Sequence, residues 1–231
     1  MRLTPCCPKP EFGALRLDAI TAFADTWQDK NGHAMNVKQD TGGAGLRQKA
    51  IAGLAGRNLI LVGLMGAGKS AIGKLVAAQL GLPYIDTDHE IEAAAQMSIA
   101  DIFAAYGEPE FRALETRVIE RVLAEGPAIV STGGGAFINP VNRELIARSG
   151  LSLWLKADLE TLWDRVKRRQ TRPLLKTENP KQTLKDLMDK RYPVYGEADV
   201  TVHSRNVRKE AVMRDVLKAL AAVDEGKYSH D

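Results

Sequence analysis

Short apolar runs and longer segments of helical periodicity alternate along the chain from residue 57 onward. Short apolar runs bounded by turn residues are typical of buried strands, and apolar positions three or four apart are typical of amphipathic helices. Strands separated by helices indicate βαβ units, in which helices cover both faces of a parallel sheet. We therefore predict an α/β protein with a three-layer α/β/α architecture and a five-stranded parallel sheet. The predicted strands are 58–62, 83–86, 128–131, 151–155 and 200–202, and the predicted helices are 69–80, 99–104, 110–124, 141–148, 159–167, 180–190 and 207–223.

The first part of the chain has a different pattern. Residues 1–56 contain turn and linker chemistry, including a Pro-flanked Cys6-Cys7 pair and the stretch Gly42-Gly43-Ala44-Gly45. Several acidic residues in this stretch argue against an organellar transit peptide, which is normally poor in acid. We predict a weakly structured, flexible N-terminal extension at 1–56, a single domain at 57–225 and a short tail at 226–231.

Composition narrows the classes of function. The 231 residues are 45% hydrophobic, enough for a core, and no apolar run approaches the roughly 18 residues that a membrane span needs. Two adjacent cysteines have neither disulfide nor metal-ligand spacing, so we expect a reducing, cytoplasmic location. The 32 basic residues nearly balance the 29 acidic ones, which argues against a nucleic-acid partner. The chain shows no obvious assembly signal, and a monomer is expected.

The strongest motif lies between the first strand and the first helix. Residues 63–70, GLMGAGKS, fit the phosphate-loop pattern G-x-x-x-x-G-K-[ST]. Glycines let such a loop wrap its backbone N–H groups around phosphate oxygens, and the helix N-terminus adds a favourable dipole. Lys69 would reach the β- and γ-phosphates, while the Ser70 hydroxyl would bind Mg²⁺. The sequence thus predicts binding of ATP or GTP with Mg²⁺. The candidate nucleotide contacts are Gly66, Ala67, Gly68, Lys69, Ser70 and Ala71.

Two carboxylates follow the second strand. Asp86 and Asp88 lie two residues apart at the carboxyl end of the sheet, where open α/β folds bind ligands. One carboxylate near the γ-phosphate would hold Mg²⁺ through water, and its neighbour would orient or deprotonate an acceptor hydroxyl. The alternative is that Asp88 only caps the helix that follows it. Spacing does not choose between these interpretations.

Two further motifs are ambiguous by themselves. Arg112 and Glu115 are three residues apart on one predicted helix face, the usual spacing of a surface ion pair. Gly133-Gly134-Gly135 follow the third strand and would expose backbone N–H groups to a ligand, although a flexible turn is the alternative.

Basic residues are concentrated late in the chain. Residues 165–176 contain six basic side chains and no acidic one. The run lacks the aromatic residues of a nucleic-acid site, so an arginine-bearing lid over the triphosphate is the better interpretation. Arg191 follows a predicted helix, where it either binds a ligand or interacts with the helix dipole.

Taken together, these motifs resemble the shikimate kinase family over residues 57–225. The resemblance implies that Asp88 contacts the ring hydroxyls of shikimate and acts as the base. It also implies that Arg112, Arg191 and the glycine turn around Gly134 hold the carboxylate, and that Asp86 joins Ser70 around Mg²⁺. Arg172 would be the lid arginine that acts opposite Lys69 as the phosphoryl group moves from ATP to the 3-hydroxyl. The motifs that carry the resemblance are the phosphate loop, Asp86-Thr87-Asp88, Phe111-Arg112 with Glu115, Gly133-Gly134-Gly135, Arg172-Pro173-Leu174-Leu175 and Arg191-x-Pro-x-Tyr.

Other functions remain open from the sequence. A gluconate-type or nucleoside-monophosphate kinase would use the same scaffold, although paired arginines suit a carboxylate better than a base. A non-catalytic, nucleotide-gated interaction module is a third possibility, against which the intact phosphate loop and aspartate pair argue. The resemblance does not decide which of Arg165, Arg168 and Arg169 contacts adenine, and it finds no counterpart for residues 1–56.

Overall fold

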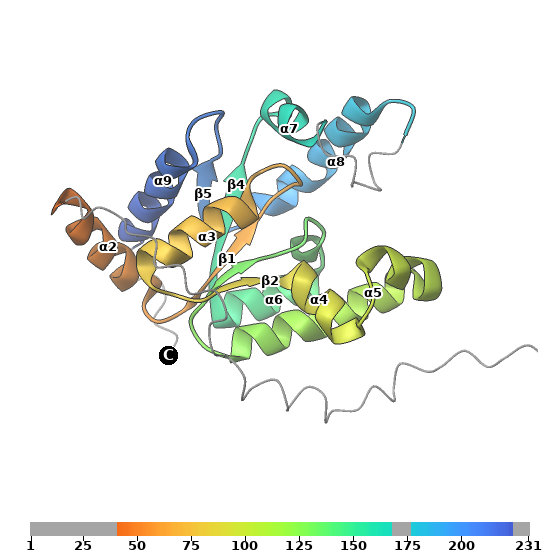
Figure 1. The fold of residues 1–231 in the computed structure, drawn as a ribbon, viewed down its shortest axis with the longest axis horizontal. Coiled ribbons are helices and arrows are strands. Elements are labelled where there is room, and N and C mark those ends of the chain that lie inside the picture. The colour runs from red at the N-terminus through yellow and green to blue at the C-terminus, as the bar shows by residue number, and fades with distance from the viewer. Residues whose placement is uncertain (1–40, 168–176, 224–231) are drawn as a thin grey trace, which may run out of the picture. The chain divides into compact units, whose positions relative to one another are not determined.

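A computed structural model describes residues 41–167 and 177–223 of the chain. Its centre is a five-stranded sheet in the order β2-β3-β1-β4-β5, with parallel pairing between all neighbours (Figure 1). The predicted α/β class and the predicted number of strands are confirmed. The strands are β1 (Asn58–Val62), β2 (Tyr84–Asp86), β3 (Ile129–Ser131), β4 (Gly150–Lys156) and β5 (Val200–His203).

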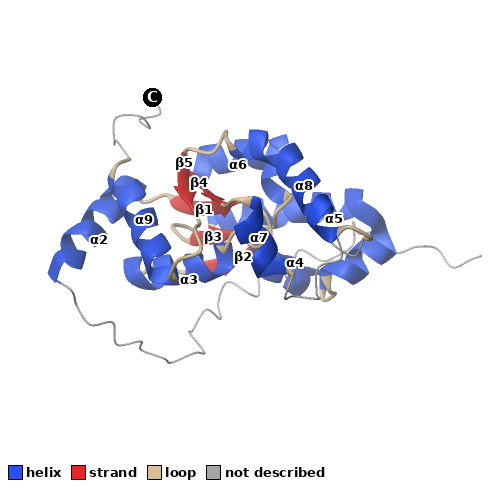
Figure 2. Cartoon of the chain, turned by 90° about the horizontal axis from the view of Figure 1, so that it is seen from above, coloured by secondary structure: helices blue, strands red, loops and turns tan. Residues whose placement is uncertain are grey.

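Helices cover both faces of this sheet. Helices α3 (Lys69–Leu80) and α9 (Lys209–Ala221) lie on one face, and α6 (Pro140–Ser149) with α5 (Ile99–Ala124) lies on the other (Figure 2). Every residue of β1 is buried, as expected for the middle strand of a doubly covered sheet. The predicted three-layer architecture is confirmed.

The strand order places one edge of the sheet where ligands bind. The chain passes from β1 outward to β2 and β3 and then crosses to β4 on the other side of β1. In the register of the sheet, Leu61 and Asp86 both pair with Ser131, so β1, β2 and β3 end side by side. The segments that follow these strands therefore meet at the switch point of the topology, the usual ligand site of an open α/β sheet.

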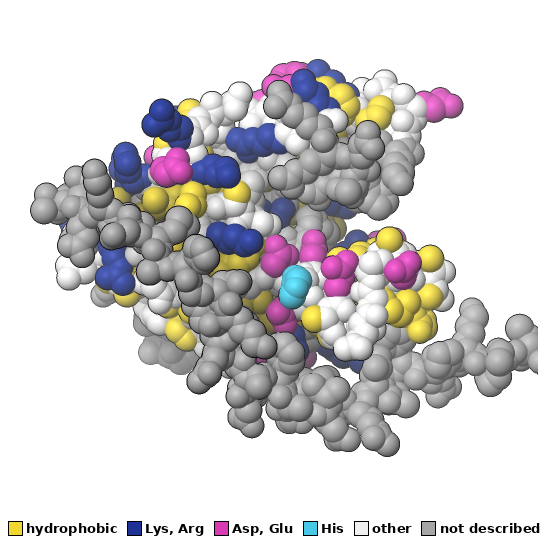
Figure 3. All heavy atoms as spheres, in the orientation of Figure 1, with side chains coloured by type: hydrophobic (Ala, Val, Ile, Leu, Met, Phe, Trp, Pro, Cys, Tyr) yellow, Lys and Arg dark blue, Asp and Glu magenta, His cyan; other side chains and the backbone are white. Residues whose placement is uncertain are grey.

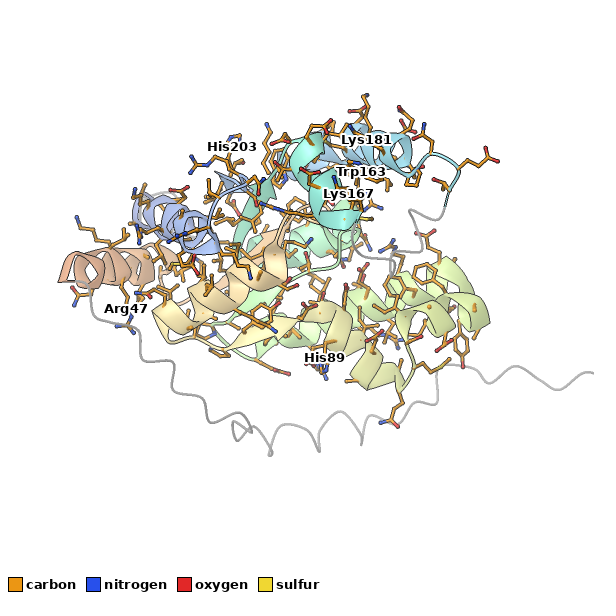
Figure 4. The ribbon with its side chains drawn as sticks, turned by 45° about the horizontal axis from the view of Figure 1, so that its top comes forward. Arg47, His89, Trp163, Lys167, Lys181 and His203 are labelled. Atoms are coloured by element: carbon orange, nitrogen blue, oxygen red, sulfur yellow. The ribbon has the colours of Figure 1, made fainter. Side chains whose placement is uncertain are left out.

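The structure corrects the predicted extension at its C-terminal end. Helix α2 (Thr41–Leu54) includes the glycine-rich stretch whose composition predicts a linker, and it packs on α9 and α3. Ala50 and Leu54 are buried. The Arg47 guanidinium donates to the carbonyls of Gln79 (2.8 Å) and Leu80 (3.1 Å), which closes the C-terminal end of α3 (Figure 4). A helix rich in glycine is stabilised here by its tertiary contacts.

The remaining helices refine the predicted boundaries. Helix α4 (Thr87–Ala95) begins directly after β2 and was not among the predicted helices. Helix α5 contains a non-helical residue, Gly107 (φ 83°), which explains why the sequence indicated two separate segments. Helix α7 (Leu159–Val166) matches its prediction closely, whereas α8 (Pro180–Tyr195) continues past the predicted end. A short 3₁₀ turn, η2 (Ala136–Ile138), follows the glycine turn. None of the helices in the described ranges is long and apolar enough to cross a membrane.

Candidate active site

The phosphate loop connects β1 to α3 in the conformation that its glycines predict. Gly63, Gly66 and Gly68 all have positive φ, and Gly68 is the left-handed N-cap of α3. The first intrahelical bond runs from Ile72 N to Gly68 O, so the first-turn N–H groups before it, including that of Ala71, precede the helical ladder. The Lys69 ammonium donates to Gly63 O (2.7 Å) and Leu64 O (3.2 Å). Backbone N–H groups and a lysine thus surround one concave turn, which suits a polyphosphate.

Side chains from α7 and from the segment after β5 support the phosphate loop. The guanidinium of Arg165, at the end of α7, donates to Gly66 O (3.1 Å), Ala67 O (3.3 Å) and Ser204 Oγ (2.9 Å). Ser204 is buried and donates in turn to Ala67 O (2.7 Å). Burial lowers the pKa of Arg165 from its usual value. These bonds occupy the carbonyls of Gly66 and Ala67. Within the loop, the Ala67 N–H donates to Leu64 O (3.1 Å).

The residues predicted to hold Mg²⁺ lie together. Ser70 Oγ donates to Asp86 Oδ2 (3.1 Å), and the Tyr84 hydroxyl donates to the same oxygen (3.0 Å). Burial raises the pKa of Tyr84 to about 12, so this phenol stays a donor. Among the described residues no group of three or more His, Cys, Asp or Glu side chains is placed to hold a metal. A hydroxyl beside one carboxylate fits Mg²⁺, a hard cation that prefers oxygen ligands and takes the others from water and phosphate.

The structure corrects one interpretation of the aspartate pair. The N-cap of α4 is Asp86, whose side chain accepts from Asp88 N (3.2 Å), so Asp88 is not the cap. The Asp88 carboxylate instead faces the glycine turn, because a β-carbon at Gly133 would lie 2.7 Å from Asp88 Oδ1. The same β-carbon would lie 3.3 Å from Glu115 Oε1. Two carboxylates therefore flank Gly133, and a side chain at this position would displace the Asp88 carboxylate.

Two guanidiniums complete this side of the site. Arg112 Nη1 donates to Glu115 Oε2 (2.8 Å), and Arg191 Nη1 donates to Gly134 O (3.0 Å). Glu115 is 1% exposed, and burial raises its pKa despite the opposing effect of Arg112. A β-carbon at Gly134 would lie 3.5 Å from Arg191 Nη1 and 3.7 Å from Gly63 O. The glycine turn is thus the point at which the charged groups meet the phosphate loop.

The phosphate loop and the charged groups around the glycine turn line one cleft. In the space-filling view the cleft opens between the part with α7 and α8 and the part with α4 and α5, and acidic side chains gather along the α4 and α5 side (Figure 3). On the opposite side, Lys181 of α8 lies near α7 and forms an ion pair with Glu160 (2.7 Å), close to Trp163 and Lys167 (Figure 4). The predicted lid arginine, Arg172, and Arg168 and Arg169 lie outside the described residues.

Sequence reasoning missed several groups that shape the site. Tyr195 lies at the end of α8 with its hydroxyl donating to Gly134 O, and Ser204 supports the phosphate loop. The predicted motif Arg191-x-Pro-x-Tyr contains Tyr195. Because the helix was predicted to end at residue 190, the sequence did not indicate which way the Tyr195 side chain points. Arg165 stood only among three candidates for the adenine contact. Its bonds to the loop carbonyls required the fold.

Comparison with known proteins identifies the family. A family model described as shikimate kinase matches residues 65–221. The shikimate kinase of Rhizobium leguminosarum bv. trifolii is 64% identical over 175 residues, 76% of this chain and 89% of the relative. The chain belongs to the shikimate kinase family. The shikimate kinase of Rhizobium meliloti is 57% identical over 187 residues, 81% of this chain and 97% of the relative.

A solved structure agrees with this assignment. The shikimate kinase from Acinetobacter baumannii in complex with shikimate is 36% identical, with a TM-score of 0.69 over 73% of this chain and 95% of that chain. Shikimate kinases are ATP-dependent enzymes that use Mg²⁺, so the predicted enzyme class and cofactors are confirmed. The resemblance stated from the motifs is confirmed as well.

Proposed function

We propose that this chain transfers the γ-phosphate of ATP to the 3-hydroxyl of shikimate, giving shikimate 3-phosphate and ADP. The observation that carries the proposal is the glycine turn, residues 133–135. It has the phosphate loop on one side and two carboxylates and two guanidiniums on the other. A donor that binds through phosphates and an acceptor with both hydroxyls and a carboxylate match these two sides.

On the nucleotide side, Lys69 and the backbone N–H groups of Gly66 and Gly68 would bind the phosphates. The N–H of Ala67, which donates to Leu64 O in this structure, would join them by exchanging that bond for one to phosphate. Ser70 and Asp86 would hold Mg²⁺, which when bound neutralises phosphate charge. Arg172 would add a second positive charge from the lid. Phosphoryl transfer depends mostly on positioning and charge stabilisation, so these groups account for most of the expected rate enhancement.

On the acceptor side, Asp88 would accept a hydrogen bond from the reacting hydroxyl and take its proton. Arg112 and Arg191 would bind the acceptor carboxylate together with the turn at Gly134. The buried Glu115 supports this role for Arg112, because a carboxylate held 2.8 Å away fixes the guanidinium before the acceptor arrives. An acceptor without a carboxylate would leave two guanidiniums in the cleft without an anionic ligand.

A coupled ADP-release assay with ATP and Mg²⁺ tests the proposal. The full chain is compared on shikimate, gluconate, CMP and AMP. We expect turnover with shikimate to exceed turnover with every other acceptor by at least about 100-fold, because a nucleotide offers a phosphate in place of the carboxylate and the open chain of gluconate does not hold its hydroxyls and carboxylate in one fixed geometry. Faster turnover with gluconate or a nucleotide would overturn it. Silence with all four acceptors, with ATP binding confirmed by calorimetry, would favour a nucleotide-gated interaction module.

We further propose that the enzyme acts as a monomer on a small molecule in the cytoplasm, as the sequence predicts. Size-exclusion chromatography with light scattering tests the first point. A mass of one chain, 25.2 kDa, is expected, and a stable dimer at micromolar concentration would contradict it.

A further inference from the structure

Three aromatic side chains pack beneath the acceptor side of the cleft. The ring of Trp154, at the end of β4, lies edge-on to Tyr192 (4.9 Å between centroids) and tilted to Tyr195 (6.0 Å). Trp154 also supports the phosphate loop, since a β-carbon at Gly63 would lie 3.4 Å from its Cδ1. The cluster therefore forms a rigid base under the junction of the two halves of the site.

Tyr195 is fully buried in this cluster and its hydroxyl donates to the carbonyl of Gly134. Arg191 donates to the same oxygen (3.0 Å), so one carbonyl of the glycine turn has two donors from α8. Burial raises the pKa of Tyr195 to about 12, and the hydroxyl stays protonated at neutral pH. The hydroxyl is thus a donor to the turn throughout the neutral pH range.

Fixing this carbonyl fixes the adjacent peptide. The Gly134 C=O and the Gly135 N–H belong to one planar trans peptide and point in opposite directions. Successive glycines have no side chains to restrict them, so an unrestrained turn would sample several peptide orientations. The bond from Ala136 N to Gly133 O (3.1 Å) holds the ends of the turn but not its central peptide. The Tyr195 hydroxyl supplies that restraint together with the Arg191 guanidinium.

We propose that Tyr195 is a positioning residue for acceptor recognition: its hydroxyl orients the Gly134 peptide so that the glycine turn and Arg191 together present a preformed site to the acceptor carboxylate. The inference rests on the proposed function and adds a group that does not touch the substrate. Because Tyr195 shares the Gly134 carbonyl with Arg191, the other N–H groups of Arg191 can bind the acceptor carboxylate.

The same helix offers a matched control. The Tyr192 hydroxyl donates to Ala157 O, just after β4, rather than to a carbonyl of the glycine turn. Both phenols are in one cluster, both donate to a backbone carbonyl, and burial raises the pKa of each to about 12. A change from tyrosine to phenylalanine removes one oxygen and keeps the ring in either case. A purely structural role predicts similar effects from the two changes.

The test compares the wild-type chain, Tyr195→Phe and Tyr192→Phe in steady-state kinetics with shikimate and ATP at 10 °C and 25 °C. We expect Tyr195→Phe to raise KM for shikimate about fivefold, with kcat and KM for ATP within about twofold, because one hydrogen bond is lost. Tyr192→Phe should leave KM for shikimate within about twofold. The two variants should have similarly lowered melting temperatures, because each loses one buried hydroxyl.

Each outcome is decisive. An unchanged KM for shikimate in folded Tyr195→Phe, or an equal rise in Tyr192→Phe, would overturn the inference. It would also be overturned if Tyr195→Phe is unfolded at 10 °C while Tyr192→Phe is folded, because the hydroxyl would then serve the fold rather than the acceptor. A wild-type chain that does not turn over shikimate would refute the proposed function instead.

Discussion

The phosphate loop is one continuous stretch, residues 63–70, whereas the acceptor side draws its charged groups from α4, α5 and α8. The loop offers mainly backbone N–H groups, arranged by glycines with positive φ and supported by Arg165 from behind. The acceptor side offers side-chain charges around a glycine turn. The phosphate loop is formed by consecutive residues, whereas the acceptor side forms only when the fold brings distant residues together.

This difference has consequences for how each half can fail. A backbone site is disturbed when a loop residue acquires a side chain or loses its permitted φ. A side-chain site is disturbed when one charge is removed, and its neighbours then face an unpaired partner. Substitutions on the two sides should therefore change different kinetic constants.

The largest effect is expected from Asp88→Asn. Loss of the base should lower kcat for shikimate about 10²–10⁴-fold, the usual contribution of general base catalysis. The isosteric amide leaves the phosphate loop intact, so the affinity for ATP, measured by calorimetry, should stay within about twofold. Turnover close to wild type would contradict the role of Asp88, and a parallel loss of ATP binding would contradict the separation of the two halves.

Gly66→Ala should have the next largest effect, on the nucleotide side. Gly66 has φ 84°, and a β-carbon there would lie 2.8 Å from Val166 Cγ1. A left-handed alanine costs about 1–2 kcal/mol, and overpacking costs about 1–3 kcal/mol. We expect KM for ATP to rise about 10–100-fold with KM for shikimate nearly unchanged. Gly45→Ala, on α2 with no atom within 4 Å of its β-carbon, is the control and should have no effect on either constant.

Glu115→Gln should separate acceptor affinity from stability. Arg112 loses a charged partner, so KM for shikimate should rise several-fold. Because burial raises the pKa of Glu115 in the folded state above its ordinary value of 4.5, the folded protein binds this proton more tightly than the unfolded chain does. The contribution of Glu115 to the free energy of unfolding is fully present below pH 4.5. It is lost as the pH rises through the raised pKa of the folded state.

Urea unfolding at several pH values checks this sign. The wild type should lose stability relative to Glu115→Gln as the pH rises through that window, and the glutamine variant should match or exceed the wild type at neutral pH. A wild type that gains stability relative to the variant over the same window would show that the ion pair with Arg112 outweighs burial.

The smallest effect on activity is expected from truncations. Removing residues 1–40 should leave kcat and the melting temperature unchanged, in keeping with the predicted extension. Removing residues 1–56 also deletes Arg47, Ala50 and Leu54 of α2 and should lower the melting temperature by about 5–10 °C, since burial of a leucine contributes roughly 1.5–3 kcal/mol. Activity at 25 °C should stay within about twofold. Equal melting temperatures for both truncations would show that α2 does not stabilise the fold.

The fold was largely predictable because its signals are local. Buried strands, the phosphate loop and the helix that follows are each encoded in a few consecutive residues. Helix α2 was not predictable in this way, because its first turn is rich in glycine and its stability comes from contacts of Ala50 and Leu54 with elements far along the chain. The end of α8 was also missed, since a proline at 193 normally argues against continued helix.

The sequence by itself determined the sheet, the phosphate loop and the family, because periodicity and a contiguous motif carry that information within short windows. Only the tertiary structure decided that Asp86 rather than Asp88 caps α4, and that Glu115 is a buried partner of Arg112 rather than half of a surface pair. It alone brought Tyr195 to the carbonyl of Gly134. Such contacts join residues tens of positions apart, and they exist only once the parallel strands bring their carboxyl ends to one edge of the sheet.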